Sequence, residues 1–331
     1  MGFRSRKTKG EQEVTGLGQT MPEQAKTLGH QGAIDFSQAV IDQRWGDAEQ
    51  LFSASELVDQ AHMISVASDI GGTPDMIDAW VDHQDGESGL GELLRGALSI
   101  VHAWDVRSTA EAAKVGAEAI DQFHHVLGSA EADLFSAAEK MPESSIPWQH
   151  LLTSGRGLHT GRSEMDDRYV NHIERGELLA GHMSFQQLIS QKWAGSHNEM
   201  WEHAEFMSRT SEPGSTKHAL VAIALIEHHI KPDVRCESIR QLPDLIGKTQ
   251  ILGDAAHNSY ADANFNADSP EGAMALSAWF TLHYLMGNWD LAASLTPMIG
   301  DRFTRFPMVY FQEATWPQIQ TYVQNRLAQA A

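Results

Sequence analysis

The 331-residue sequence predicts an all-α fold, and three observations support this prediction. Helix-start signals recur from one end of the chain to the other, and the apolar residues between them fall at three- and four-residue spacing. Strand signals are almost absent, because the chain has no sustained apolar–polar alternation and no Asn-Gly or Asp-Gly turn between β-branched runs. We therefore expect about fourteen helices joined by short loops.

Capping signals place the expected helix starts along the chain. In a capping box, an N-cap hydroxyl and a Glu or Gln three residues later satisfy free backbone N–H groups reciprocally. Such boxes occur at residues 108–111, 196–199 and 315–318. A hydroxyl before proline marks two further starts, at Thr73-Pro74 and Ser269-Pro270. Apolar stripes at helical spacing, as over residues 90–101 and 220–226, provide the expected buried faces.

One short phrase occurs twice, near the two ends of the chain. Trp45 is followed three residues later by Ala48, and Trp289 is followed in the same way by Ala292. In helical-hairpin repeats the small Ala lets the partner helix approach closely, and the aromatic ring fills the space beside it. The two phrases are not separated by a multiple of the tetratricopeptide period of about 34 residues. The sequence therefore predicts an irregular α-solenoid of helical hairpins, tetratricopeptide-like, as a single domain over residues 32–331.

Residues 1–31 are expected to form a flexible basic tail, because this segment is rich in Gly, Gln, Lys and Thr and lacks an apolar stripe. No apolar segment follows the basic residues, so we expect no secretory signal. No stretch of the sequence is apolar enough to span a bilayer. Together these features predict a cytoplasmic protein.

Composition and charge argue against several classes of function. The 24 Lys and Arg residues against 44 Asp and Glu residues give a net charge of −20, without the basic stripe that phosphate contacts need. The same charge disfavours docking on an anionic membrane, so we expect neither a nucleic-acid nor a membrane partner. The single cysteine, Cys236, excludes an internal disulfide and a multi-cysteine metal site. Charged runs such as residues 166–168 are expected to be solvated helix surface.

The clearest resemblance to known proteins lies in residues 192–206, which read Lys-Trp-Ala-Gly-Ser-His-Asn-Glu-Met-Trp-Glu-His-Ala-Glu-Phe. This segment resembles a group of uncharacterised, mostly actinobacterial, tetratricopeptide-like proteins with a Trp-x-Gly-Ser-His-x-x-Met core. The sequence Ala-Leu-Ile-Glu-His-His that ends at His229 also looks similar, as do Pro147-Trp148, Gly155-Arg156-Gly157 and Ala278-Trp279-Phe280. The resemblance implies a helical-repeat fold and brings no known activity or functional residue.

Histidine and glutamate residues gather around the same segment and are the strongest candidates for chemistry. They are His197, Glu199, His203, Glu227, His228 and His229. Glu199 and His203 share a helix face, as metal ligands do. However, Glu199 is the expected capping partner of Ser196, and His197 and His203, six residues apart, lie on different faces. We therefore predict no metal or other cofactor, and His197, His203 and His228 remain the candidate ligands of an alternative.

We expect a non-enzymatic protein whose concave face binds a protein or peptide partner. Because Arg and Trp are favoured binding anchors, the candidate binding residues are Arg156, Trp193, His197 and Trp201. The alternative is an all-α metal-dependent enzyme that uses the His/Glu cluster over residues 197–229. The sequence contains no Gly-x-Ser-x-Gly elbow, phosphate-binding loop or dinucleotide fingerprint that would indicate another enzyme class.

Overall fold

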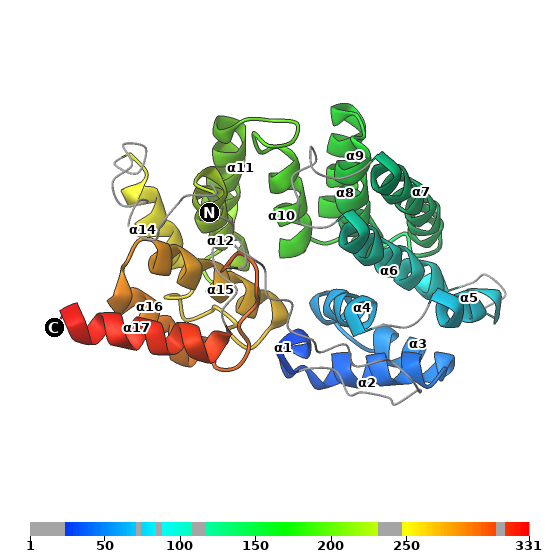
Figure 1. The fold of residues 1–331 in the computed structure, drawn as a ribbon, viewed down its shortest axis with the longest axis horizontal. Coiled ribbons are helices and arrows are strands. Elements are labelled where there is room, and N and C mark those ends of the chain that lie inside the picture. Colours follow the sequence, from blue (N-terminus) through cyan, green and yellow to red (C-terminus); the bar gives the residue numbers. More distant parts are fainter. Residues whose placement is uncertain are drawn as a thin grey trace, which may run out of the picture.

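The chain is helical throughout the part that the structure describes (Figure 1). This computed structural model describes residues 24–70, 74–83, 88–107, 117–230, 247–308 and 315–330. In these ranges helices alternate with turns and loops, and no residue belongs to a strand. The all-α prediction is confirmed.

The helices follow one another with short connections. The first half contains α1 (Gln24–Thr27), α2 (Gln31–Ile41), α3 (Trp45–Ser53), α4 (Leu57–Ile70), α5 (Pro74–His83), α6 (Leu90–Arg107), α7 (Ala117–Lys140), α8 (Ile146–Leu158) and α9 (Arg162–Glu174). The second half contains α10 (Leu179–Leu188), α11 (His197–Thr210), the 3-10 helix η2 (Thr216–His218), α12 (Ala219–His228), α14 (Thr249–Asn258), α15 (Pro270–Leu285), α16 (Trp289–Ile299) and α17 (Trp316–Ala330). Chain neighbours pack against each other, as α6 and α7 do, and as α16 does with α15 and α17.

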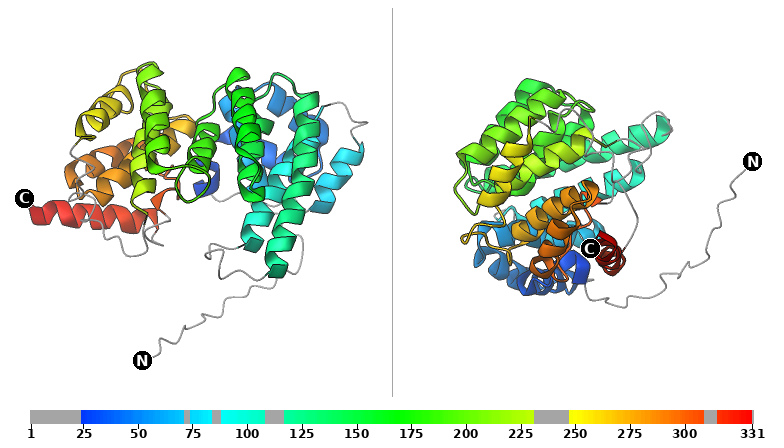
Figure 2. Two further views of the ribbon diagram at one scale, coloured as in Figure 1. Left: turned by 90° about the horizontal axis from the view of Figure 1, so that it is seen from above. Right: turned by 90° about the vertical axis from the view of Figure 1, so that its left-hand side faces the viewer.

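Helices that do not follow one another directly in the chain also meet. α4 packs on α2 and α6, and it contacts α15 as well (Figures 1 and 2). α8 contacts α10, and α12 packs against α15. The N-terminal and C-terminal parts of the fold are therefore joined through α8–α10 and through α4–α15.

The helical region begins inside the segment that the sequence assigns to a tail. α1 and the first residue of α2 precede residue 32, and Thr27 and Leu28 are buried. His62 Nε2 of α4 also lies 2.9 Å from the Thr27 carbonyl oxygen. The boundary predicted at residue 31 is therefore too late, because the polar composition of this stretch conceals its contacts with α4. Residues 1–23 of the predicted tail lie outside the described residues.

The predicted starts of α15 and α17 have capping contacts of the expected kind. Ser269 Oγ accepts a hydrogen bond from Gly272 N at 2.9 Å, at the start of α15. Thr315 N donates to Gln318 Oε1 at 2.9 Å, at the start of α17. The starts predicted at residues 73 and 108–111 lie outside the described ranges.

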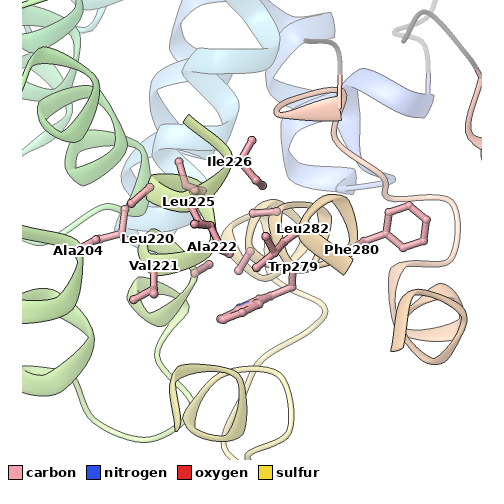
Figure 3. Packing of buried hydrophobic residues seen from close by; sticks show 14 of the residues in the cluster. Ala204, Leu220, Val221, Ala222, Leu225, Ile226, Trp279, Phe280 and Leu282 are labelled. Atoms are coloured by element: carbon pink, nitrogen blue, oxygen red, sulfur yellow. The ribbon is translucent and has the colours of Figure 1, made fainter. Parts of the chain in front are cut away.

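Two clusters of buried side chains form the core. One lies among α2 to α8 and includes the fully buried Trp80; the other lies among α8 to α17. The second cluster centres on α12, where every residue from Ala219 to Glu227 is buried and several side chains lie beside Trp279 and Leu282 of α15 (Figure 3). A helix that is apolar on all sides has to be surrounded, and α12 contacts α10, α11, α14 and α15. None of the described helices combines the length and the apolar character needed to cross a membrane.

The two Trp-x-x-Ala phrases open helices and bury their alanines, as predicted. Trp45 begins α3 and Trp289 begins α16, and Ala48 and Ala292 are fully buried. Trp45 stacks on Trp80, with 4.9 Å between the ring centroids. The small side chain lets α3 pack on α2, and it lets α16 pack on α15 and α17.

Replacing Ala292 by leucine should lower the free energy of unfolding by about 1–3 kcal/mol, because the larger side chain overpacks the contacts of α16. Urea unfolding followed by circular dichroism measures this change. Ser294→Leu is the matched control, since Ser294 lies on the exposed side of α16, where the same side chain fits. Equal stability of the two variants would show that Ala292 is not a packing contact.

Candidate functional site

The segment that links α10 to α11, residues 189–196, folds back on the end of α10. Ala194 N donates to Leu188 O at 3.0 Å, and Ser196 N donates to Ile189 O at 3.1 Å. The backbone comes so close that a Cβ on Gly195 would collide with the Ile189 carbonyl group. Glycine is therefore required at position 195. This close approach sets the directions of the residues on either side of it.

Trp193 leaves this connection and meets Arg156 of α8 and Trp104 of α6. The guanidinium carbon of Arg156 lies 5.5 Å from the ring centroid of Trp104 and 5.5 Å from that of Trp193. The two indole rings are edge-on to each other, with centroids 6.1 Å apart. Cation–π contacts at partly exposed sites contribute roughly 0.5–2 kcal/mol. The structure thus brings together two predicted binding residues, and it adds Trp104, which sequence reasoning missed.

The Arg156 cluster, defined as Trp104, Arg156 and Trp193, continues to the surface through histidines. The ring centroid of His159 lies 6.0 Å from that of Trp193, and the centroid of His124 lies 6.3 Å from that of His159. His159 is exposed, whereas the three members of the cluster are half-buried. The cluster therefore has one side within the fold and one side open to solvent.

His197 lies at the first position of α11 and stacks on His228 at the end of α12. Their ring centroids are 3.9 Å apart and their planes make an angle of 21°. The ring centroid of His228 in turn lies 4.6 Å from that of His229.

Glu227, the residue before His228, is buried, and its carboxylate pairs with Lys192 Nζ at 2.6 Å. A buried carboxylate needs such a partner, so this ion pair ties α12 to the α10–α11 connection.

The capping box at residues 196–199 is only half formed. Ser196 Oγ accepts from Glu199 N at 3.1 Å, as predicted. The sequence predicts that the Glu199 carboxylate accepts a hydrogen bond from the backbone N–H of Ser196, and this bond is not formed. The carboxylate instead pairs with Arg162 Nη1 at 2.5 Å. The reciprocal bond cannot form because Ser196 N already donates to Ile189 O. Glu199 instead ties α11 to the first residue of α9.

Replacing Ser196 by alanine should lower the free energy of unfolding by roughly 0.5–2 kcal/mol through the lost cap. Glu199→Ala should cost less, roughly 0–1 kcal/mol, because its ion pair with Arg162 is solvated. Urea unfolding of both variants measures the difference, with Ser129→Ala on the exposed side of α7 as the control. A larger loss in Glu199→Ala than in Ser196→Ala would contradict this division of roles.

Trp201 lies apart from the Arg156 cluster. Its ring is half-buried against the C-terminal core cluster, and Lys248 Nζ lies 4.8 Å from its ring centroid. Lys248 is the N-cap residue of α14. The sequence prediction groups Trp201 with Trp193, whereas the structure places Trp201 at a contact between α11 and the start of α14.

His203 belongs to a different, buried network. The Tyr169 hydroxyl oxygen lies 2.7 Å from His182 Nδ1 and 2.9 Å from His203 Nε2, and the Tyr169 ring stacks on Phe185 at 3.9 Å. The nitrogen of one histidine therefore accepts a hydrogen bond from the Tyr169 hydroxyl, while the nitrogen of the other histidine donates a hydrogen bond to its oxygen. The outer nitrogens, His182 Nε2 and His203 Nδ1, are buried without a hydrogen-bond partner in the described structure.

The three candidate metal ligands do not converge on one point. His197 and His228 stack ring on ring, while His203 is bonded to Tyr169. Among the described residues, no group of three or more His, Cys, Asp or Glu side chains is arranged to hold a metal ion. Cys236 lies outside these residues.

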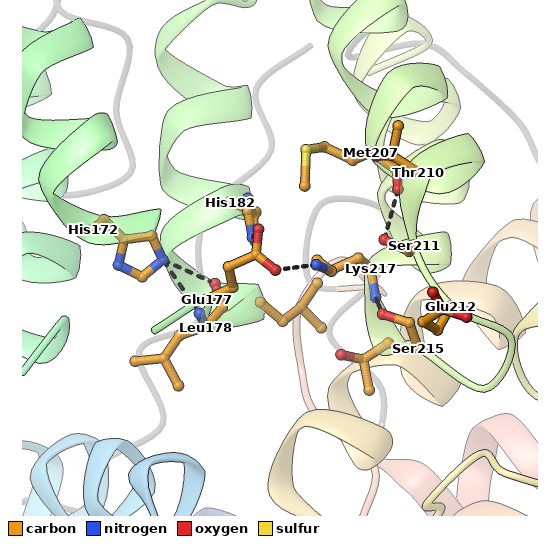
Figure 4. Close-up of polar contacts among 12 residues, drawn as sticks. His172, Glu177, Leu178, His182, Met207, Thr210, Ser211, Glu212, Ser215 and Lys217 are labelled. Atoms are coloured by element: carbon orange, nitrogen blue, oxygen red, sulfur yellow. Dashed lines mark hydrogen bonds and ion pairs between the residues drawn. The ribbon is translucent and has the colours of Figure 1, made fainter. Parts of the chain in front are cut away.

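Polar contacts beside His182 join α9, α10 and η2 (Figure 4). Glu177 pairs with Lys217 of η2, and a Glu177 carboxylate oxygen lies 4.0 Å from His182 Nε2. On the other side, His172 Nε2 lies 3.2 Å from the Leu178 carbonyl oxygen. These contacts hold the start of α10 in place, and His182 connects them to the Tyr169 network.

The buried network is uncharged at neutral pH. Burial is the main cause that lowers the pKa of His182, and together with the neighbouring His172, His203 and Lys217 it brings this pKa to about 2. Burial also lowers the pKa of His203 to about 4 and raises the pKa of Tyr169. These values lie far from the pH at which a general acid or base works best. The geometry fits a structural polar network better than an acid–base site.

No protein-family model, curated protein or solved structure matches this chain. Its function has to be inferred from the arrangement of its own residues.

Arg168 shows how far that arrangement departs from local sequence patterns. The sequence predicts residues 166–168 as solvated surface, and this prediction is wrong for Arg168, whose side chain is 3% exposed. Its guanidinium pairs with Glu131 of α7 at 2.5 Å and with Glu164 at 2.6 Å, and it donates to Leu151 O of α8 at 2.8 Å. Arg168 therefore joins α7, α8 and α9, and it supports the helix that carries Arg156.

The free energy of unfolding should fall as the pH drops from about 7.5 to about 5.5. In the unfolded chain each histidine takes up a proton near its ordinary pKa of about 6.5, whereas in the fold His182 and His203 stay neutral to lower pH. Below about pH 6.5, these two histidines therefore take up protons when the chain unfolds. The stability that each residue contributes is present above pH 6.5 and is lost as the pH falls, by roughly 1 kcal/mol over this interval.

The variant His203→Gln isolates one of these contributions, because it removes a titrating ring and keeps a hydrogen-bonding group beside Tyr169. Urea unfolding across the same pH interval should give a slope of stability against pH that is smaller by about half a proton on average. Parallel slopes for the wild-type protein and His203→Gln would contradict the assignment.

Proposed function

We propose that this chain is a non-enzymatic helical-repeat protein that binds a protein or peptide segment. In this proposal the helices form an irregular, tetratricopeptide-like array of hairpins. The packing of chain neighbours, such as α6 on α7, α7 on α8 and α15 on α16, supports that arrangement. The observation that carries the binding function is the contact of Arg156 with both Trp104 and Trp193.

The composition and the position of the Arg156 cluster suit a binding surface. Its members come from α6, α8 and the α10–α11 connection, so a partner that touches all of them bridges three elements. Arg and Trp are the side chains most enriched among binding anchors. Because the guanidinium and the rings already restrain one another, less side-chain freedom is lost when a partner binds.

His197 and Trp201 extend the proposed surface along α11. They are four residues apart in this helix, so they share a face, and Trp193 precedes them on the connection. His197 is held by His228, and Trp201 lies under Lys248. A bound segment that follows α11 from the Arg156 cluster would contact these two residues in turn.

Peptides selected from a random phage-displayed library against the wild-type protein should bind Trp193→Ala and Arg156→Ala at least about tenfold more weakly, because each variant removes one anchor of the cluster. Fluorescence polarisation of labelled peptides gives the dissociation constants. Phe206→Ala is the control, since it removes a 58% exposed aromatic ring from another part of α11 and should leave binding unchanged.

Two outcomes would contradict the proposal. One is equal affinity of the selected peptides for the wild-type protein and both cluster variants. The other is a selection that yields no saturable binder. Elemental analysis of the same preparation addresses the metal-enzyme alternative: stoichiometric zinc, iron or manganese that is lost from His197→Ala would favour the enzyme.

A further inference from the structure

A pocket separate from the Arg156 cluster opens between α4, the α7–α8 connection and the end of α9. It has a volume of about 370 Å³. Leu57, Met141 and Pro142 form its apolar wall, and Arg175, the C-cap residue of α9, also lines it. The pocket therefore combines an apolar wall with a cation.

The Arg175 guanidinium is held in one position by neighbouring backbone and side-chain groups. Nε donates to Pro142 O at 2.8 Å, and Nη1 donates to Asn171 O at 3.1 Å and to Asn171 Oδ1 at 2.7 Å. The guanidinium carbon also lies 5.4 Å from the ring centroid of Trp148. A guanidinium fixed in this way is already oriented for a ligand, and its remaining Nη2 group makes no hydrogen bond to a described residue.

Arg175 also has no carboxylate partner among the described residues, although the chain is acidic. The arginines that do pair with carboxylates are Arg44, Arg95, Arg162, Arg168, Arg209 and Arg302. Arg175 instead bonds only to neutral oxygens, in a chain with 44 acidic residues and 24 basic ones. Its positive charge is therefore left for a carboxylate from outside the described fold.

A second hollow continues from this pocket. Its volume is about 660 Å³, and it shares Gln60 and Met141 with the first pocket. Phe52 and Leu90 supply apolar surface in this hollow, and Glu49 there is bonded to Ser88. Because they share Gln60 and Met141, the two hollows adjoin and together form one groove.

We propose that this groove binds a peptide segment with a single carboxylate, which pairs with Arg175, next to an apolar side chain that lies against Met141. The bond expected at Arg175 is a charge-assisted hydrogen bond from the guanidinium to the carboxylate. Glu143, which is exposed and lines the same pocket, repels any anion, and it repels a doubly charged one such as phosphate about twice as strongly as a single carboxylate. The site does not involve Trp193 or Arg156, so this proposal can be tested independently of the one for the Arg156 cluster.

A titration followed by nuclear magnetic resonance of the arginine Nε–H signals tests the proposal. The probes are acetyl-Leu-Glu-amide, its neutral isostere acetyl-Leu-Gln-amide, and acetyl-Leu-Leu with a free terminal carboxylate. At least one carboxylate peptide should shift the Arg175 signal saturably, while the Gln peptide and inorganic phosphate should not. The responding peptide shows whether the carboxylate belongs to a side chain or to a chain end.

Arg175→Gln should weaken binding of the responding peptide at least about tenfold. Arg209→Gln is the charge-matched control, because Arg209 is 70% exposed on α11 and should leave the affinity unchanged. If Arg175→Gln does not fold, the salt dependence of the wild-type protein replaces it: raising sodium chloride from about 50 to about 500 mM should weaken the carboxylate peptide severalfold. No saturable shift by either carboxylate peptide, a shift by the Gln peptide equal to that of the responding peptide, unchanged affinity in Arg175→Gln, or salt-independent binding would overturn the proposal.

Discussion

The close approach of Gly195 to the Ile189 carbonyl group is the constraint on which the proposed binding surface depends. Because the connection closes on the end of α10, Trp193 is directed toward Arg156 and Ser196 reaches the N-cap position of α11. A side chain at position 195 would push the connection outward and disturb both contacts together. The Trp-x-Gly-Ser-His pattern is therefore one geometric unit, in which each residue makes a contact that the turn creates.

Burial of α12 supports this unit from the other side. The helix is apolar around its whole circumference, and its enclosure fixes the end that carries Glu227 and His228. His228 stacks on the ring of His197. The Glu227 carboxylate pairs with Lys192, and Gln187 Nε2 donates a hydrogen bond to the same carboxylate at 2.7 Å. A buried carboxylate without these partners would be costly, so α12 and the α10–α11 connection stabilise each other.

The features that could be predicted from the sequence depend on near neighbours in the chain. The cap at Ser196 depends on Glu199, which lies within one helical turn. The burial of Ala292 depends on the helices next to α16 in the chain. The features that could not be predicted depend on which helix lies opposite. Arg168 is buried because Glu131 of α7, 37 residues earlier, pairs with it, and Trp104 joins the candidate site only because α6 lies beside α8. No local sequence pattern predicts such contacts between separate helices.

Fluorine nuclear magnetic resonance of fluorotryptophan-labelled protein tests the role of Gly195 most directly. The Trp193 resonance, assigned with Trp193→Phe, should move in both Gly195→Ala and Arg156→Ala, because each change disturbs the same ring contact. Gly253→Ala should leave it in place, since a Cβ at Gly253 would meet no atom within 4 Å. An unmoved Trp193 resonance in Gly195→Ala would contradict the claim that this glycine positions the proposed binding surface.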